Sequence, residues 1–185
     1  MLFWKKKESP AAELSDATLD DYLSLLRSKG WKIAESSGAV ELNDAFRRRY
    51  ARIPKQYEKF LSRVASCMNA DETVWFLCAA DYNAPDAEGF AWNEFEKMDL
   101  EAAGDDEVWR EKTVAFWDKH MPFLLSVGGE YAHRSFRMDD EKFGSVVDGY
   151  EEVTAVSDVA ASFVDFIRLH SDEVNEKPRT LPDFI

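Results

Sequence analysis

The three histidines are the side chains best suited to acid–base or metal chemistry, and their spacing matches no ligand motif. His120, His133 and His170 lie at least 13 residues apart, whereas a zinc motif such as HExxH places its ligands one helical turn apart. The first and last are expected at helix ends, where the backbone dipole favours the cationic form and a structural role. His133 alternates with Tyr131 on the strand face opposite Phe136. We therefore expect it to face solvent, where it either contacts a partner or is an idle surface residue.

Other catalytic and cofactor motifs are also missing from the sequence. No GxSxG elbow occurs, and Gly144-Ser145 lacks the strand–turn–helix context of one. Gly128-Gly129 alone indicates a turn and not a phosphate loop. Asp139-Asp140-Glu141 opens like a calcium loop, but Phe143 and Tyr150 occupy places that need oxygen ligands. We expect no metal and no cofactor, and we expect a polar hairpin turn at this acidic run.

The charge balance favours a basic protein partner over nucleic acid or membrane. The chain has 36 Asp and Glu residues against 23 Lys and Arg residues, for a formal net charge of −13. Duplex nucleic acid and anionic membrane would be repelled, and a basic protein would be attracted. The alternative is that the acidity serves only solubility. The one basic cluster, Arg47-Arg48-Arg49, spreads over roughly 200° of a helix, which favours a face that is salt-bridged to neighbours such as Glu58.

The cysteines and the N-terminal segment indicate a cytoplasmic protein. Cys67 and Cys78 form no CxxC pair. The first falls in a helical apolar stripe that begins at Tyr57 and the second on a probable strand, so both are expected to be buried thiols in a reducing compartment. The segment Met1–Lys7 has its charges after its apolar residues, which is the reverse of a signal peptide. The sequence has no apolar run of ~20 residues, so it predicts no membrane-spanning helix.

The apolar periodicity predicts helices followed by a meander of strands. Helical spacing follows Ser15 and Pro54, a buried strand is expected over Thr73–Ala79, and a helical insert over Asp105–Lys119. Short apolar or β-branched runs separated by Gly and Asp follow Met121. The pattern favours an α+β class, with N-terminal helices packed on a largely antiparallel sheet that is closed by a C-terminal helix. The expected boundaries are a flexible tail over 1–14, one domain over 15–170 and a C-terminal tail over 171–185.

Several short motifs resemble those of the SUKH superfamily, which contains a fungal regulator of cell-wall synthesis and many bacterial immunity proteins. From about Leu42 to Leu169, the chain has an opening helix, an aromatic strand, a Gly-rich turn with Tyr, and a closing helix in the order typical of that family. The matching residues are Ile53-Pro54, Tyr57, Phe60-Leu61, Trp75-Phe76, Met121-Pro122-Phe123-Leu124, Gly129-Glu130-Tyr131, Asp139 or Asp140, Gly144 with Val146, Ala160, Ser162-Phe163 and Phe166-Ile167. The Asn-Gly-Gly common after the first family helix is reduced here to Asn69, and the helical insert is longer.

The resemblance implies a non-catalytic protein-binding domain of bacterial type: an immunity protein, or antitoxin, that sequesters a toxin such as a nuclease. An acidic inhibitor would complement the basic cleft of a nuclease. The alternatives are a regulatory or scaffolding module acting on endogenous protein partners, and a hydrolase with a carboxylate-lined cleft. Exposed acidic and aromatic positions near strand ends are the expected partner contacts. They are Glu130, Tyr131, His133, Asp139, Asp140 and Glu141, with Asp81, Asp86 and Glu88 as a second patch.

Overall fold

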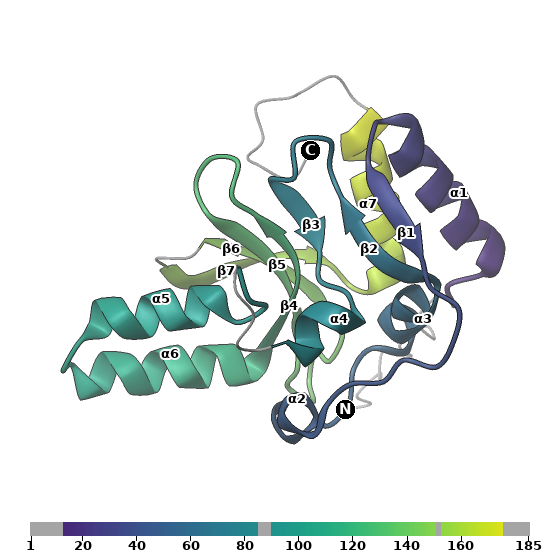
Figure 1. The fold of residues 1–185 in the computed structure, drawn as a ribbon. Helices are drawn as coiled ribbons and strands as arrows, with labels where there is room; N and C mark the ends of the chain where they lie inside the picture. The colour runs from purple at the N-terminus through teal and green to yellow at the C-terminus, as the bar shows by residue number, and fades with distance from the viewer. Residues whose placement is uncertain (1–12, 85–89, 151–152, 176–185) are drawn as a thin grey trace, which may run out of the picture.

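A computed structural model of the chain describes residues 13–84, 90–150 and 153–175, and it confirms the predicted α+β class (Figure 1). The strands form one antiparallel sheet whose spatial order equals the chain order. They are β1 (Lys32–Glu35), β2 (Val64–Met68), β3 (Val74–Phe76), β4 (His120–Ser126), β5 (Ala132–Arg137), β6 (Val146–Tyr150) and β7 (Val153–Ala160). The sheet is therefore a seven-stranded meander with β1 and β7 at its edges.

The described residues also form seven helices, and side-chain caps fix where two of the longer ones begin. The helices are α1 (Asp16–Ser28), α2 (Asp44–Arg49), α3 (Lys55–Arg63), α4 (Ala79–Asn83), α5 (Glu94–Ala103), α6 (Glu107–Lys119) and α7 (Phe163–Asn175). The Ser15 hydroxyl accepts the N–H of Thr18 at 3.0 Å, and the Asp106 carboxylate accepts the N–H of Trp109 at 2.9 Å. Ser and Asp suit these two positions, because their side-chain oxygens satisfy the free N–H groups of a first helical turn.

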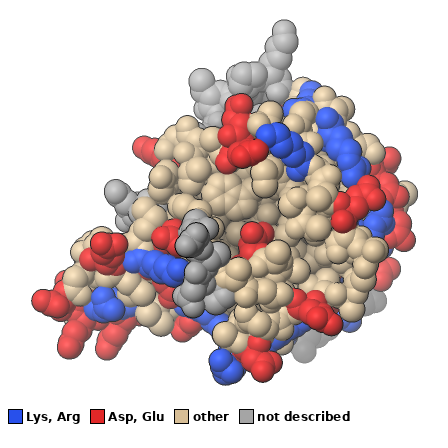
Figure 2. All heavy atoms as spheres, viewed as in Figure 1, with Lys and Arg blue, Asp and Glu red and all other residues tan. Residues whose placement is uncertain are grey.

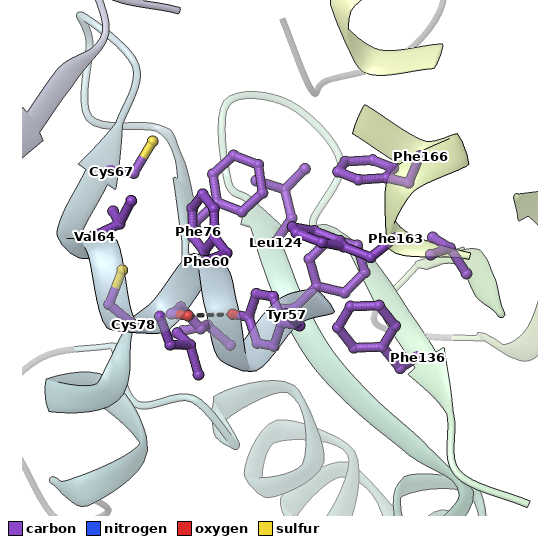
Figure 3. Packing of buried hydrophobic residues seen from close by; sticks show 14 of the residues in the cluster. Tyr57, Phe60, Val64, Cys67, Phe76, Cys78, Leu124, Phe136, Phe163 and Phe166 are labelled. Atoms are coloured by element: carbon purple, nitrogen blue, oxygen red, sulfur yellow. Dashed lines mark hydrogen bonds between the residues drawn. The ribbon is translucent and has the colours of Figure 1, made fainter. Parts of the chain in front are cut away.

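Aromatic side chains form the main core on one face of the sheet, here called the inner face. Phe123 and Phe136 stack with their ring centroids 4.2 Å apart, and the Tyr57 ring of α3 lies 5.0 Å from Phe136 and 5.2 Å from Phe163 of α7 (Figure 3). The Tyr57 hydroxyl donates to the carbonyl of Leu77. The buried phenol thus has the hydrogen bond that its burial requires.

A buried histidine joins α1 and α7, which also pack together on the inner face. Nδ1 of His170 lies 2.6 Å from the hydroxyl of Tyr22, and the imidazole stacks on Phe166 with centroids 5.4 Å apart. The prediction that His170 lies at a helix end is wrong, because α7 continues to Asn175. The folded domain therefore extends past residue 170, where the C-terminal tail was expected to begin. At the other boundary, Leu14 of the expected N-terminal tail is buried.

The segment after α3 differs from its predicted form. Apolar spacing continues from Tyr57 to Cys67, which favoured a longer helix, but α3 ends at Arg63 and the next five residues form β2. As a strand, this segment pairs with β1 on one side and β3 on the other. Tertiary pairing here overrides a local pattern that is compatible with either structure. Cys67 is on a strand instead of a helix, but both it and Cys78 are buried, as predicted.

Both thiols should resist modification until the protein unfolds. Burial raises the pKa of the Cys67 thiol and raises that of Cys78 to about 12, so the reactive thiolate is scarce and inaccessible. We expect no reaction with Ellman's reagent near neutral pH in native buffer, and two reactive thiols per chain in urea. Rapid labelling of either thiol in the native protein would contradict the packing described for it.

Candidate protein-binding surface

The other face of the sheet, here called the outer face, is crossed by one row of directly paired residues. From β1 to β7, the successive partners in register are Lys32, Met68, Trp75, Leu125, His133, Gly149 and Val156. Directly opposed residues of antiparallel strands point to the same side. The hairpin formed by α5 and α6 packs over His133, whereas Lys32 is exposed and Met68 and Trp75 are half-buried. The row therefore has a covered half and an open half.

His133 is fully buried in the covered half, so the prediction that it faces solvent is wrong. Its ring centroid lies 4.8 Å from that of Trp117 and 6.2 Å from that of Phe95, and its Nδ1 is 2.8 Å from Oγ of Ser135. The strand alternation itself was correct, since His133 points away from the core around Phe136. The helical hairpin supplies a cover that the strand pattern does not reveal. Burial lowers the pKa of His133 to about 3, so the ring is neutral near pH 7.

Gly149 makes room for this imidazole. A Cβ atom at Gly149 would lie 2.6 Å from Nε2 of His133 and 3.2 Å from Cγ1 of Val156. The ring therefore lies directly over the backbone of β6, in a place that a larger residue would fill. Enclosed between this backbone and the hairpin, His133 cannot meet a substrate or a partner, and its role is structural.

Ion pairs fix the base of the hairpin against α2. Arg49 binds Glu96 of α5 through two nitrogen–oxygen contacts of 2.5 and 2.7 Å, and its Nε donates to Asp118 of α6 at 3.0 Å. A bidentate pair with a largely buried carboxylate is among the stronger polar contacts in proteins. Arg47 approaches Glu58 at 4.0 Å. Two arginines of the basic cluster are thus salt-bridged, as predicted, and one of them, Arg49, holds the hairpin in place over the sheet.

The open half of the outer face carries a connected set of large apolar side chains. The Phe90 ring lies 5.5 Å from Trp75 and 6.1 Å from Tyr131, both edge to face, and Met68 is the partner of Trp75 across β2 and β3. Tyr131 is 36% exposed, and the other three are half-buried. We call these four residues the Trp75 surface. In Figure 2, the area between the hairpin and β1 is largely free of charged side chains.

Acidic side chains lie at one end of the Trp75 surface. The β2–β3 loop carries Asp71 and Glu72, and the β4–β5 loop carries Glu130, all of them exposed. A backbone hydrogen bond of 2.8 Å joins the two loops, and Glu72 also pairs with Lys32 at 2.7 Å. Apolar rings beside exposed carboxylates suit a protein partner that buries apolar side chains in the middle of the interface and places basic ones at its rim.

The predicted contact residues do not form one patch. Tyr131 belongs to the Trp75 surface and Glu130 borders it, whereas Asp139, Asp140 and Glu141 lie in the β5–β6 loop at the opposite end of β5. A strand of this length separates its two ends by roughly 20 Å. The β5–β6 loop is a hairpin turn, as predicted, and it stays a separate candidate contact.

Of the second predicted patch, the structure describes only Asp81, whose carboxylate caps a helix. Asp81 accepts the backbone N–H of Cys78 at 2.6 Å and so caps α4, and burial raises its pKa. This intramolecular hydrogen bond explains the carboxylate at position 81, so no binding partner is needed to explain it. Asp86 and Glu88 lie outside the described residues.

Three members of the Trp75 surface were not predicted as contacts: Met68, Trp75 and Phe90. The sequence indicates a buried strand around Trp75, and its neighbours Val74 and Phe76 are indeed buried on the inner face. Strand alternation places Trp75 on the opposite face, and a large aromatic there needs either a cover or a partner. That signal was available in the sequence, but the extent of the cover was not, since it depends on where the hairpin packs.

The described residues include neither a membrane-spanning helix nor a metal site. Within the described ranges, no helix is long and apolar enough to cross a membrane. In the same ranges, no group of three or more His, Cys, Asp or Glu side chains is placed to hold a metal ion. No protein-family model matches the sequence, and no curated protein matches it.

Proposed function

We propose that this chain is a non-catalytic protein-binding domain and that the Trp75 surface is its contact face. The observation that carries the proposal is the open half of the outer face, where four large apolar side chains are connected and partly exposed beside three carboxylates. Aromatic and methionine side chains are enriched at protein interfaces, and Trp and Tyr are frequent among the few residues that account for most of the binding free energy.

The net charge of −13 favours a basic partner. Long-range attraction speeds the encounter of oppositely charged proteins, and complementary charges at the rim exclude wrong partners. The carboxylates of Asp71 and Glu130 supply negative charge at the end of the Trp75 surface, whereas that of Glu72 is paired with Lys32. A nuclease toxin, whose substrate cleft is basic, has the matching chemistry.

The resemblance of the sequence motifs to the SUKH superfamily supports one role within this class, that of a bacterial immunity protein that sequesters a toxin in the cytoplasm. Sequestration needs a stable surface and no catalytic groups. The buried, structural placement of His133 and the buried thiols of Cys67 and Cys78 agree with that requirement.

Affinity capture with matched baits tests the proposal. We expect the wild-type protein to retain one basic protein in stoichiometric amount from its native lysate, and Tyr131→Lys to reduce that capture by about tenfold or more. Leu169→Lys is the control, because Leu169 is 38% exposed on α7 and the change adds the same charge.

The identity of the captured protein separates the two roles. A protein that stops growth when expressed alone and is tolerated with this chain supports the immunity role, whereas several endogenous proteins and no toxin point to a regulatory or scaffolding module. Equal capture by Tyr131→Lys and wild type would show that the Trp75 surface is not the contact face.

A further inference from the structure

Helix α6 has exposed apolar side chains that the fold does not use, and one of them, Val114, borders a groove between α5 and α6. Among the described residues, five large hydrophobic side chains are exposed, and three of these lie on α6: Val108 at 62%, Trp109 at 40% and Val114 at 41%. The helix contributes Thr113 and Trp117 to the interface with the sheet. Val114 is about a quarter of a turn from Thr113 and stays 41% exposed, so packing against the sheet does not account for its apolar side chain.

The stability of α6 as a helix does not explain Val114 either. A β-branched residue lowers helix stability by roughly 0.5 kcal/mol relative to alanine, because its side chain loses rotamer freedom against the preceding turn. Exposed helix positions usually carry charged or straight-chain residues for this reason. Val114, in the interior of α6, thus weakens the helix while it stays exposed to solvent, which indicates a use outside the folding of the chain.

A groove with one of these valines in its wall runs between α5 and α6. It has a volume of about 360 Å³ and is lined by Leu100, Arg110, Glu111, Val114, Ala115 and Asp118. Both of its ends are fixed by hydrogen bonds. Nη1 of Arg110 donates to the carbonyls of Leu100 and Gly104 at 2.8 and 3.3 Å, and Asp118 accepts the Nε of Arg49 at 3.0 Å. The groove is therefore formed before any partner arrives, which reduces the entropic cost of binding.

The charge around the groove selects the chemistry of its occupant. Between Glu94 and Lys119 the hairpin has nine acidic residues and four basic ones, and Figure 2 shows acidic side chains gathered at its free end. Glu111 and Asp118 line the groove itself. Apolar side chains beside the carboxylate of Glu111, on a hairpin with an excess of acidic residues, match a helix with one apolar face and basic flanks.

We propose that the groove between α5 and α6 binds a basic amphipathic helix of a partner protein. A third helix lying against α5 and α6 would bury Leu100 and Val114 at the usual interaxial distance of about 8–10 Å. It would also place its basic side chains near Glu111 and Asp118. The groove is separate from the Trp75 surface, so the proposal for one of them can be contradicted while the other stands.

A labelled probe peptide tests the proposal by fluorescence anisotropy with the full chain. The probe is an amphipathic helix of about four turns built from Leu, Lys and Ala, and the control is a scrambled peptide of the same composition that has no apolar face. We expect the amphipathic probe to bind at least about tenfold more tightly than the scrambled one. Val114→Lys should weaken its binding by about tenfold or more, while Leu169→Lys and Tyr131→Lys change it by less than about twofold.

Three results would overturn the proposal. Equal affinity for both peptides would mean that the protein does not recognise an apolar helix face. Equal affinity of the amphipathic peptide for wild type and Val114→Lys would place its binding site outside the groove. In sedimentation of the protein without peptide, we expect a monomer. A dimer that Val114→Lys dissociates would identify the occupant of the groove as a second copy of this chain.

Discussion

Replacing Gly149 with alanine should lower the free energy of unfolding by about 2–3 kcal/mol, although the change adds only one methyl group. The new Cβ would lie 2.6 Å from Nε2 and 2.8 Å from Cε1 of His133, well inside contact distance. The imidazole cannot swing away, because Trp117 and Phe95 enclose it and Ser135 bonds to its Nδ1. The strain must instead displace β6 or lift the hairpin.

Urea denaturation followed by circular dichroism measures this loss, and a double mutant identifies its cause. His133→Ala alone should also be destabilising, because it leaves a cavity under the hairpin and removes the partner of Ser135. In the presence of His133→Ala, however, the Gly149→Ala change should cost much less, because the clash is gone. A Gly149→Ala protein as stable as wild type would contradict the position of the His133 ring.

Acid should destabilise the protein well above the pH at which carboxylates titrate. Burial lowers the pKa of His133 from 6.5 to about 3. As the pH falls below 6.5, the unfolded chain takes up a proton at this residue and the folded chain does not, so the free energy of unfolding decreases. The loss from this one group should reach about 2.5 kcal/mol between pH 7 and pH 4.5. His120, whose pKa burial also lowers, acts in the same direction.

Urea titrations at a series of pH values, with His133→Gln as the comparison, isolate this contribution. Glutamine cannot titrate, so the variant should lose about 2.5 kcal/mol less than wild type over the same interval. Carboxylates such as Asp158, whose pKa is lowered by hydrogen bonds from Arg137 and Lys142, lose their contribution only below about pH 4, outside this window. Parallel pH profiles for wild type and His133→Gln would show that the histidine is not buried as described.

Local signals were sufficient for the fold class and for several helix starts. Helical spacing was predicted to follow Ser15 and Pro54, and α1 and α3 begin directly after them, because the signals that start a helix lie within its first turn. The order of elements was sufficient to predict an antiparallel meander closed by a helix. The errors came where distant segments decide the structure. Cys67 is on a strand because β1 and β3 pair with its segment, and neither pairing is visible in the local apolar pattern.

At the candidate site, too, the local sequence predicted which face a side chain lies on, whereas its burial depends on segments distant in the sequence. Strand alternation correctly placed His133 and Tyr131 away from the inner core, but on the outer face His133 is buried and Tyr131 is exposed. The α5–α6 hairpin buries one and leaves the other exposed, and its position depends on contacts of Arg49 with Glu96 and Asp118, which are distant from Arg49 in the sequence. The sequence therefore indicated the candidate residues on the β4–β5 loop, but it did not reveal Trp75 as their neighbour.

The central claim, that the Trp75 surface is the contact face, is tested most directly by hydrogen-exchange mass spectrometry of the protein with and without its captured partner. We predict that the partner slows exchange in the β2–β3 loop and strand β3, over 71–76, and in the β4–β5 loop, over 127–131, where the backbone borders this surface. Exchange around Asp139–Glu141 should stay unchanged. Protection confined to that β5–β6 loop, with none near Trp75, would contradict the account and place the contact at the other end of the sheet.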